Sequence, residues 1–215
     1  MNKAIIIGAT GAIGKEVFKQ CVENKYYDKV YVYGRSSIEN LPTSEKVEKI
    51  VIDFKNIDIN DYENFGNADV FACLGTTIKQ AGSKEVQREV DYQYTINFAK
   101  KCENKVKSFT IVSSLGTDRK KTNFYLTLKK ELERDLAKLN IGILRIIRPS
   151  LLIAKREDRK LENVAMFLAP VLSKVLVGSL EKYKPVKVEK VAKSMVYYAV
   201  NNYEQGVYSY EKFID

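Results

Sequence analysis

The sequence predicts an α/β fold in which a doubly wound, mainly parallel sheet carries helices on both faces. Short and almost wholly apolar runs alternate with helix-like patterns along most of the chain, which is typical of strands buried on both sides. The first run ends in closely spaced glycines, and a helix pattern begins directly after them. With 215 residues the chain has the length of one domain, and we expect residues 1–215 to form it.

The individual elements follow from hydrophobic periodicity. Helix patterns start near residue 13 and recur over about 84–102, 123–139 and 188–201. Regular alternation stops after Pro149, so we expect residues 150–190 to form a small C-terminal subregion that caps the substrate side. Strand-like runs occupy residues 4–7, 30–33, 50–52, 70–74, 109–112 and 141–147, with a late strand near 207–213.

The longest apolar stretch, residues 165–178, contains Pro170 and Lys174 and is too short to cross a bilayer. It predicts a buried or lid-like helix and no membrane span. The first strand pattern begins at Lys3, which predicts that no signal or transit peptide precedes the fold.

Residue types that are missing or scarce exclude several kinds of chemistry. The chain has no histidine, which excludes a nucleophile activated by histidine. A general acid or base must therefore come from Tyr, Lys, Asp, Glu or Cys. The cysteines Cys21, Cys73 and Cys102 form no CxxC motif. We expect no disulfide framework and no metal site, and the unpaired thiols indicate the reducing cytoplasm.

The net charge of +9 raises the question of a polyanionic partner. The lysines are scattered among acids, as in residues 129–135, which is typical of a solvated helix face. Nucleic acid is therefore not expected as the primary partner. The positive charge suits attraction of a phosphorylated cofactor, with a small molecule as the substrate.

The glycine-rich segment 8–14, Gly-Ala-Thr-Gly-Ala-Ile-Gly, carries the strongest functional signal. Gly8 permits a tight turn, Gly11 lets the backbone approach a diphosphate, and Gly14 lets the following helix pack closely. The free N–H groups at a helix start favour bound anions. We predict that this loop holds the diphosphate of a nicotinamide cofactor. The predicted contacts are Gly8, Thr10, Gly11, Ala12, Ile13 and Gly14.

The end of the second strand discriminates between NAD and NADP. An acid there binds the ribose 2′-hydroxyl of NAD, whereas an arginine accommodates the 2′-phosphate of NADP. The sequence has Arg35 and Ser36 at this place and no acid, and a guanidinium can contact a phosphate through paired hydrogen bonds. We therefore expect NADP, with NAD as the less favoured cofactor. Asp53, directly after the third strand, is a candidate adenine contact, with an ordinary loop aspartate as the alternative.

Tyr125 and Lys129 form a YxxxK pattern in an expected helix, where residues i and i+4 share a face. A cation beside a phenol favours the phenolate, so such a pair can exchange a proton with a substrate. The same spacing begins at Tyr183 and at Tyr208. Only Tyr125 follows a buried strand that ends in hydroxyl side chains, of which Ser114 is a candidate to bind a substrate carbonyl. The alternative is an incidental pair on a surface helix.

Together, the glycine loop, the serine and the YxxxK pattern resemble the short-chain dehydrogenase/reductase family, whose members share an NAD(P)-binding Rossmann sheet. The GxxGxxG spacing is that of the extended and atypical members. Further stretches resemble the atypical oxidoreductase group named for the Tat-interactive protein, and the resemblance runs nearly end to end. These stretches are residues 73–77, 81–82, 113–118, 123–129 and 148–152.

The resemblance implies roles for particular residues. Ser114, with Ser113 as the alternative, would match the active-site serine. Tyr125 and Lys129 would match the catalytic pair and would also contact the cofactor. The further residues that would line the cofactor are Leu74, Gly75, Thr76, Pro149 and Leu151.

The chain also departs from the family pattern. Ser150 stands where the family has a glycine after the proline. Asp91 stands where extended members carry an asparagine in the helix after the fourth strand. That asparagine belongs to the family's proton relay, so Asp91 is the residue most at odds with the pattern.

The resemblance implies an NADP-dependent oxidoreductase that transfers hydride to or from a small carbonyl or alcohol. A non-catalytic NADPH-binding regulator or sensor is the alternative, because one fold can serve either role. A sugar-nucleotide epimerase is a weaker alternative, since the region after Pro149 is short for a nucleotide-sugar domain. Either a monomer or a homodimer is expected.

Overall fold

The computed structural model describes residues 1–58, 62–153 and 183–214. At its centre is a seven-stranded sheet in the order β3-β2-β1-β4-β5-β6-β9, and every neighbouring pair is parallel. This order confirms the predicted doubly wound fold. The strands are β1 (Lys3–Ile7), β2 (Lys29–Gly34), β3 (Val47–Val51), β4 (Ala68–Ala72), β5 (Ser108–Val112), β6 (Ile143–Ile147) and β9 (Gly206–Tyr208).

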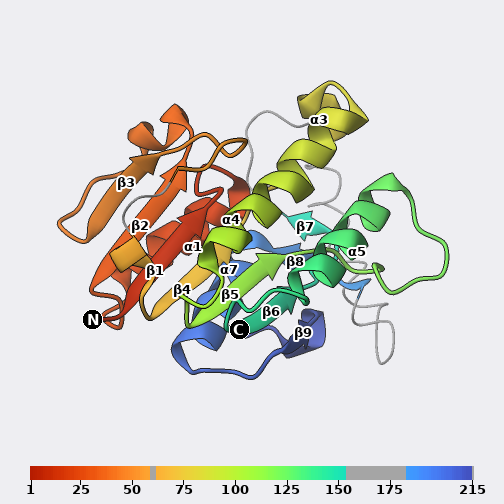
Figure 1. Ribbon diagram of the computed structural model, residues 1–215. Helices are drawn as coiled ribbons and strands as arrows, with labels where there is room; N and C mark the ends of the chain where they lie inside the picture. Colours follow the sequence, from red (N-terminus) through yellow and green to blue (C-terminus); the bar gives the residue numbers. More distant parts are fainter. Residues whose placement is uncertain (59–61, 154–182, 215) are drawn as a thin grey trace.

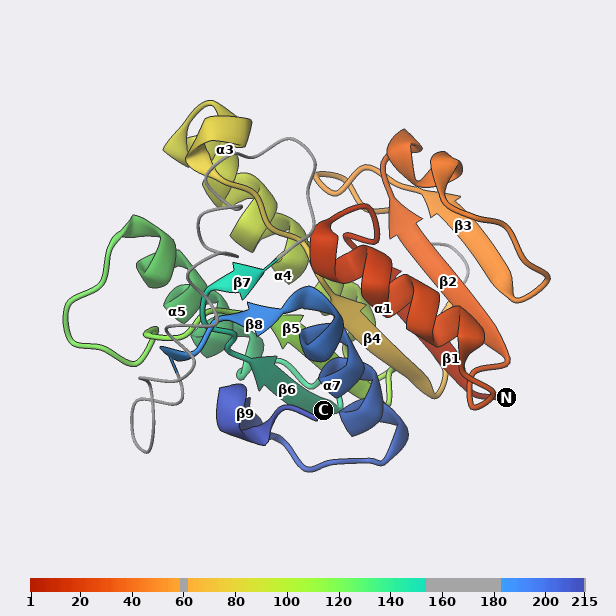
Figure 2. The same ribbon diagram turned by 180° about the vertical axis from the view of Figure 1, so that it is seen from behind.

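Helices cover both faces of this sheet. α1 (Ala12–Glu23) and α7 (Val188–Val200) pack together on one face, while α4 (Tyr94–Cys102) and α5 (Phe124–Leu136) lie on the other (Figures 1 and 2). These two layers explain why the strands are apolar on both sides. The shorter helical turns are η1 (Ser36–Asn40), η2 (Tyr62–Phe65), α2 (Ile78–Ala81), α3 (Lys84–Arg88) and η5 (Tyr210–Lys212).

Alternate residues of β1 face alternate cores, as the strand geometry requires. Ala4 and Ile6 belong to the core that contains α1 and α7, whereas Ile5 and Ile7 belong to the core that contains α4 and α5. Each of these side chains is 0% exposed. β1 is thus fixed at the centre of the molecule, and the glycine segment 8–14 follows it directly.

The strand order reverses at β1. The chain places β1, β2 and β3 successively outward and then crosses to put β4 on the other side of β1. The loops after β1 and β4 therefore leave in opposite directions, and the crevice at such a reversal is where open parallel sheets bind ligands. The glycine segment and residues 73–76, which follow β4, meet at this point.

The helix expected over about 84–102 is continuous but not uniform. α3 leads into a π-helical turn, η3 (Glu89–Gln93), which leads into α4. Such π turns usually occur singly within α-helices, and often at functional sites. Asp91 lies in this turn and is fully buried.

The C-terminal part differs in detail from the expected pattern. The late strand is limited to β9, and the 3-10 turn η5 follows it. β7 (Leu152–Ile153) pairs with β8 (Val186–Lys187) and brings together the two ends of the expected subregion. The helix expected over 165–178 lies outside the described residues. Within the described ranges, no helix combines the length and the apolar character that crossing a bilayer requires.

Candidate active site

The loop after β1 is packed too tightly for side chains at two of its glycines. Gly8 adopts a φ of 80°, and a Cβ on it would lie 2.6 Å from the carbonyl carbon of Cys73. A Cβ on Gly14 would lie 2.0 Å from the carbonyl oxygen of Gly8. Gly11 is the N-cap of α1 and brings no capping side chain to that helix start. This cradle of bare backbone fits a diphosphate bound at a helix N-terminus.

A cleft of about 410 Å³ lies between this loop and the segment after β4. It lies at the reversal of strand order, and Arg35 reaches it from the end of β2. Glycine backbone for a diphosphate and a guanidinium at the end of β2 together fit a dinucleotide. The lining residues are Gly8, Thr10, Gly11, Arg35, Cys73, Leu74, Gly75, Thr76, Gln80, Ala81, Val86 and Val90.

Other predicted cofactor contacts do not line this cleft. Ile13 is 7% exposed and packs into the core beneath α1. The carboxylate of Asp53 accepts a hydrogen bond from the Lys55 N–H at 2.9 Å, and Leu151 is largely exposed. Direct contact with a cofactor at these positions stays a prediction. The lining set also omits Ala12, Gly14, Ser36, Tyr125, Lys129 and Pro149.

The first turns of α5 bring the predicted catalytic pair together. Asn123 Oδ1 accepts a hydrogen bond from the Leu126 N–H at 2.9 Å and caps the helix just before Tyr125. Lys129, one turn later, is 2% exposed. Its Nζ donates to the Val112 carbonyl oxygen at 3.3 Å and lies 5.9 Å from the centre of the Tyr125 ring. The pair therefore lies against the carboxyl end of β5.

The two serines after β5 have different surroundings. Ser113 is buried, and its hydroxyl donates to Glu133 Oε1. Thr117 donates to the same oxygen at 3.1 Å, and Arg148 donates to Glu133 through Nε at 3.0 Å and Nη2 at 2.6 Å. Ser114 is half-buried, and its hydroxyl makes a long 3.5 Å contact with the next carbonyl oxygen. The geometry thus leaves Ser114, rather than Ser113, available to a ligand.

The charged run 129–135 is not a solvated face throughout, which corrects the sequence-based expectation. Lys129 and Glu133 are 2% and 7% exposed, whereas Arg134 is exposed. Residues four apart share a helix face, so both buried groups point inward together with Leu132 and Leu136. Sequence reasoning missed Glu133, although its spacing from Lys129 carried the signal.

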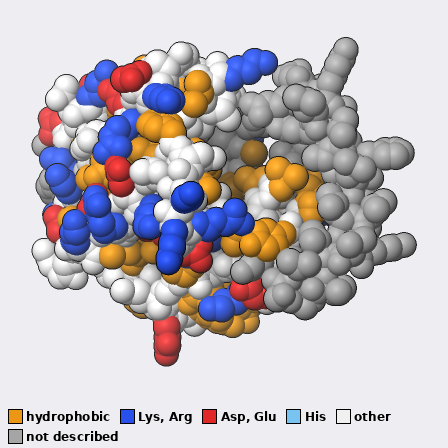
Figure 3. Space-filling model, turned by 90° about the vertical axis from the view of Figure 1, so that its right-hand side faces the viewer, with side chains coloured by type: hydrophobic (Ala, Val, Ile, Leu, Met, Phe, Trp, Pro, Cys, Tyr) orange, Lys and Arg blue, Asp and Glu red, His pale blue; other side chains and the backbone are white. Residues whose placement is uncertain are grey.

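The outer side of α5, opposite this buried face, carries many charged side chains. Figure 3 shows Lys and Arg side chains over much of the described part of the side on which α5 lies, with a few acids among them. Arg88 pairs with Glu131 at 2.7 Å, and Lys138 pairs with Asp135 at 2.7 Å. Exposed pairs of this kind contribute little to stability. They neutralise part of the positive charge at this surface.

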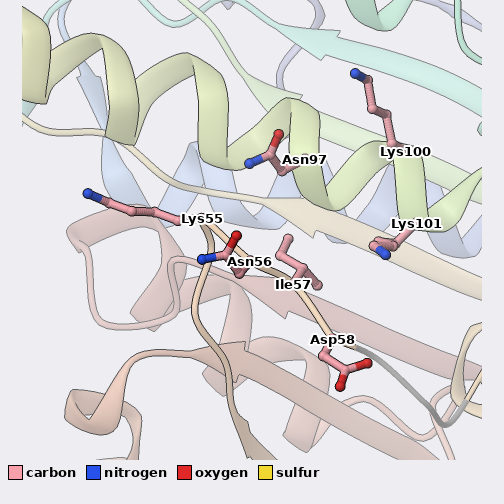
Figure 4. Close-up of a pocket in the computed structure, with 7 residues that line it drawn as sticks. All are labelled: Lys55, Asn56, Ile57, Asp58, Asn97, Lys100 and Lys101. Atoms are coloured by element: carbon pink, nitrogen blue, oxygen red, sulfur yellow. The ribbon is translucent and has the colours of Figure 1, made fainter.

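A second hollow, of about 680 Å³, lies between the segment after β3 and α4 (Figure 4). Lys55, Lys100 and Lys101 line it, but their amino groups do not converge on one point in Figure 4. Lys55 is already paired with Glu89 at 2.8 Å. The lining of this hollow includes no glycine, so the cleft beside the glycine loop is the better phosphate site.

Comparison with known proteins agrees with a cofactor cleft. A family model described as NAD(P)H-binding matches residues 8–158. The mitochondrial protein FMP52 of Debaryomyces hansenii is 30% identical over 208 residues, which cover 94% of this chain and 90% of that protein. Protein HTATIP2 of Rattus norvegicus is 30% identical over 162 residues, which cover 74% of this chain and 66% of that protein.

A solved structure shares the fold. The ADP-L-glycero-D-manno-heptose-6-epimerase of Helicobacter pylori matches with a TM-score of 0.69 at 20% identity, covering 96% of this chain and 75% of that chain. At this identity the likeness concerns the fold alone, because one fold serves many reactions.

The relatives overturn the expected location. FMP52 proteins from several organisms are named mitochondrial, so the prediction of a cytoplasmic protein is wrong. Cys21, Cys73 and Cys102 are unpaired in the structure. Unpaired thiols indicate a reducing environment, but that property does not single out the cytoplasm.

Proposed function

This chain belongs to the NAD(P)H-binding family as an atypical short-chain dehydrogenase/reductase, and we propose that it is an NADP-dependent oxidoreductase of a small carbonyl or alcohol. One observation carries the proposal: the cleft at the glycine loop lies on the same sheet edge as Tyr125 and Lys129. A nicotinamide cofactor, when bound, supplies or accepts the hydride. The chain contributes the cradle and the proton-transfer groups.

Each catalytic side chain has a distinct role in this proposal. Tyr125 gives a proton to the carbonyl oxygen of the substrate, or takes one from an alcohol. The ammonium of Lys129, which lies 5.9 Å from the centre of the Tyr125 ring, holds the cofactor ribose. Ser114, whose hydroxyl is not committed to Glu133, donates to the substrate oxygen and orients it.

A separate cleft of about 340 Å³ lies beside the loop that carries Ser114, although neither Ser114 nor Tyr125 lines it. Leu115 and Gly116, which follow β5, line it together with Arg148 and Tyr183. Ligand pockets commonly span about 300–1,000 Å³, so this volume suits a small molecule. A nucleotide sugar would need more room, and this chain covers only 75% of the epimerase chain that shares its fold.

Tyr125→Phe tests the catalytic role, because it removes one hydroxyl and keeps the ring. We expect NADPH oxidation across a panel of carbonyl substrates to fall to background, while NADPH binding, followed by nicotinamide fluorescence, persists. Tyr208→Phe is a matched control, because Tyr208 and Lys212 have the same YxxxK spacing and the Lys212 Nζ lies 5.5 Å from the centre of the Tyr208 ring. Turnover should persist in this variant. Full turnover in Tyr125→Phe would reject the mechanism. Binding without turnover by the unaltered protein would favour a sensor.

Arg35 supports NADP rather than NAD, because it lines the cleft at the end of β2. Arg35→Ser should lower NADPH affinity about tenfold to a hundredfold, which corresponds to a charge-assisted hydrogen bond of about 1.5–3 kcal/mol. NADH affinity should change little, since NADH lacks the 2′-phosphate. Fluorescence titration with each cofactor measures both constants. An equal loss for both cofactors would reject the preference for NADP.

A further inference from the structure

Asp91 is a buried carboxyl beside the cofactor cleft, and it has no role in the catalytic mechanism proposed above. It lies in the π turn η3 and is 0% exposed. Its Oδ1 accepts a hydrogen bond from the Thr76 N–H at 2.6 Å. Its Oδ2 is buried and has no hydrogen-bond partner among the described residues. Buried polar atoms are nearly always satisfied, so a half-satisfied carboxyl at this place calls for an explanation.

Gln87, one turn earlier in the same helical segment, binds the carbonyl group of Thr76, the residue whose N–H contacts Asp91. Its Nε2 donates to the Thr76 carbonyl oxygen at 3.1 Å, and the side chain is 3% exposed. The N–H and the carbonyl of Thr76 are therefore both bound by side chains of one segment. Thr76 lines the cleft next to Gly75, whose backbone no side chain restricts.

The charge that bears on Asp91 comes from a different helix. Burial raises the pKa of Asp91, while Lys129 on α5, the Thr76 N–H and the side chain of Gln87 act against that rise. Cys73, at the end of β4, lies in the field of the same lysine, and burial raises the pKa of its thiol to about 12. Cys73 is therefore neutral near pH 7, and Lys129 is the charged group that favours the carboxylate.

An acceptor at position 91, rather than its charge, makes the contact with Thr76. An asparagine there would offer the same oxygen to the Thr76 N–H. Its Nδ2 would also offer a donor to Gln87 Oε1, which has no partner among the described residues. The contact with Thr76 can thus be tested separately from the charge.

We propose that Asp91 and Gln87 clamp the main chain of Thr76 and so fix the wall of the cofactor cleft that follows β4. Asp91 is then a positioning residue for cofactor binding, and the inference rests on the proposed cofactor site. A wall already held in one conformation loses less conformational freedom when a ligand binds. Asp91 and Gln87 contact Thr76 from the protein interior, since both side chains are buried.

D91A and D91N distinguish the acceptor from the charge. D91A removes the acceptor, and we expect the Kd for NADPH to rise by up to about tenfold, as loss of one hydrogen bond implies. D91N keeps the acceptor, and its Kd should stay close to that of the unaltered protein. Glu89→Gln is a matched control in the same turn, because Glu89 pairs with Lys55 near the surface. Its Kd should not change.

The hydrogen-exchange rate of the Thr76 amide tests the contact with Asp91 in the absence of cofactor. The amide should exchange faster in D91A than in the unaltered protein, and D91N should restore the slow rate. Gln87→Ala, which removes the second contact, should raise the Kd as well and replaces D91A if that variant does not fold.

Two results would overturn the proposal: an unchanged Kd in D91A, or a Kd in D91N as high as that in D91A. Absence of NADPH binding in the unaltered protein would instead reject the proposed function, while exchange at Thr76 would still decide whether the clamp exists.

Discussion

Glu133 and Asp91 are two buried carboxyl groups on helical segments that cover the same face of the sheet (Figure 1). Both oxygens of Glu133 are occupied, because Ser113, Thr117 and Arg148 all donate to them. Asp91 uses one oxygen for Thr76, and the other has no partner in the described chain. Burial of a charge needs compensation, and Glu133 has more hydrogen-bond donors than Asp91.

The difference separates a carboxylate that stabilises the fold from one that does not. Glu133 ties the loop after β5 to the end of β6 through Ser113 and Arg148, and this fixes the backbone that carries Ser114. Asp91 brings a less fully hydrogen-bonded carboxyl into the interior, which costs stability. In the proposed clamp, the benefit of Asp91 is that it holds the wall of the cleft at Thr76.

The largest effect should follow from removing the charge of Glu133. Glu133→Gln keeps the size of the side chain but leaves the guanidinium of Arg148 without its counter-charge, and these side chains are only 8% and 18% exposed. Breaking a buried pair in this way costs about 3–5 kcal/mol, and we expect about 3 kcal/mol because some solvent reaches Arg148. Urea unfolding measures the loss.

Glu131→Gln, two residues away on the same helix, is the control. Glu131 pairs with Arg88, and their side chains are 28% and 47% exposed, so its loss should cost about 0–1 kcal/mol. Asp91→Asn should cause no loss at neutral pH. A Glu133→Gln variant as stable as Glu131→Gln would remove the distinction between the two buried carboxyls.

The sequence was sufficient for the sheet but not for these two carboxyls. Apolar runs alternating with helices predict a parallel sheet, because buried strands leave a continuous apolar pattern. Glu133 is harder to predict, since the run 129–135 has the composition of a surface helix. Only the helical period places Glu133 beside Lys129 on the inner face. Arg148, its partner, comes from a different strand end.

The surroundings of Asp91 could not be predicted from sequence spacing. The position was identified as a departure from the family pattern, but its main partner is the backbone N–H of Thr76. Backbone groups leave no mark on a residue pattern, and a π turn has no simple sequence signature. Gly8 and Gly14 were easier to interpret, because their lack of a side chain is itself the signal.

The next effect should separate the two adjacent serines. Ser113→Ala removes a donor to Glu133 and leaves that oxygen with fewer partners, so it should cost about 1–3 kcal/mol of stability. Ser114→Ala should leave stability nearly unchanged but reduce kcat about 10²-fold to 10³-fold, as removal of one donor to a reacting oxygen does. Urea unfolding and NADPH oxidation distinguish them. The reverse pattern would assign the catalytic role to Ser113.

The smallest effect is a pH dependence of stability at Asp91. Burial raises the pKa of Asp91 in the folded protein, so its favourable contribution is complete below the usual carboxyl range, near pH 4. It is lost as the pH rises through the raised value. The Asp91→Asn variant does not lose stability in this way, because an asparagine side chain does not ionise. The free energy of unfolding of the variant, relative to the unaltered protein, should therefore increase as the pH rises above about 4.

The stability of Asp135→Asn relative to the unaltered protein should change with pH in the opposite direction to that of Asp91→Asn. This comparison shows whether the direction of the pKa shift is the cause. Hydrogen bonds from Arg134 and Lys138 hold the pKa of Asp135 well below its usual range, so its stabilising contribution is present above that range and lost on acidification. The unaltered protein should then exceed Asp135→Asn in stability at neutral pH and converge with it in acid. If Asp91→Asn followed the same course, Asp91 would be a compensated carboxylate like Glu133, and the contrast between the two regions would fail.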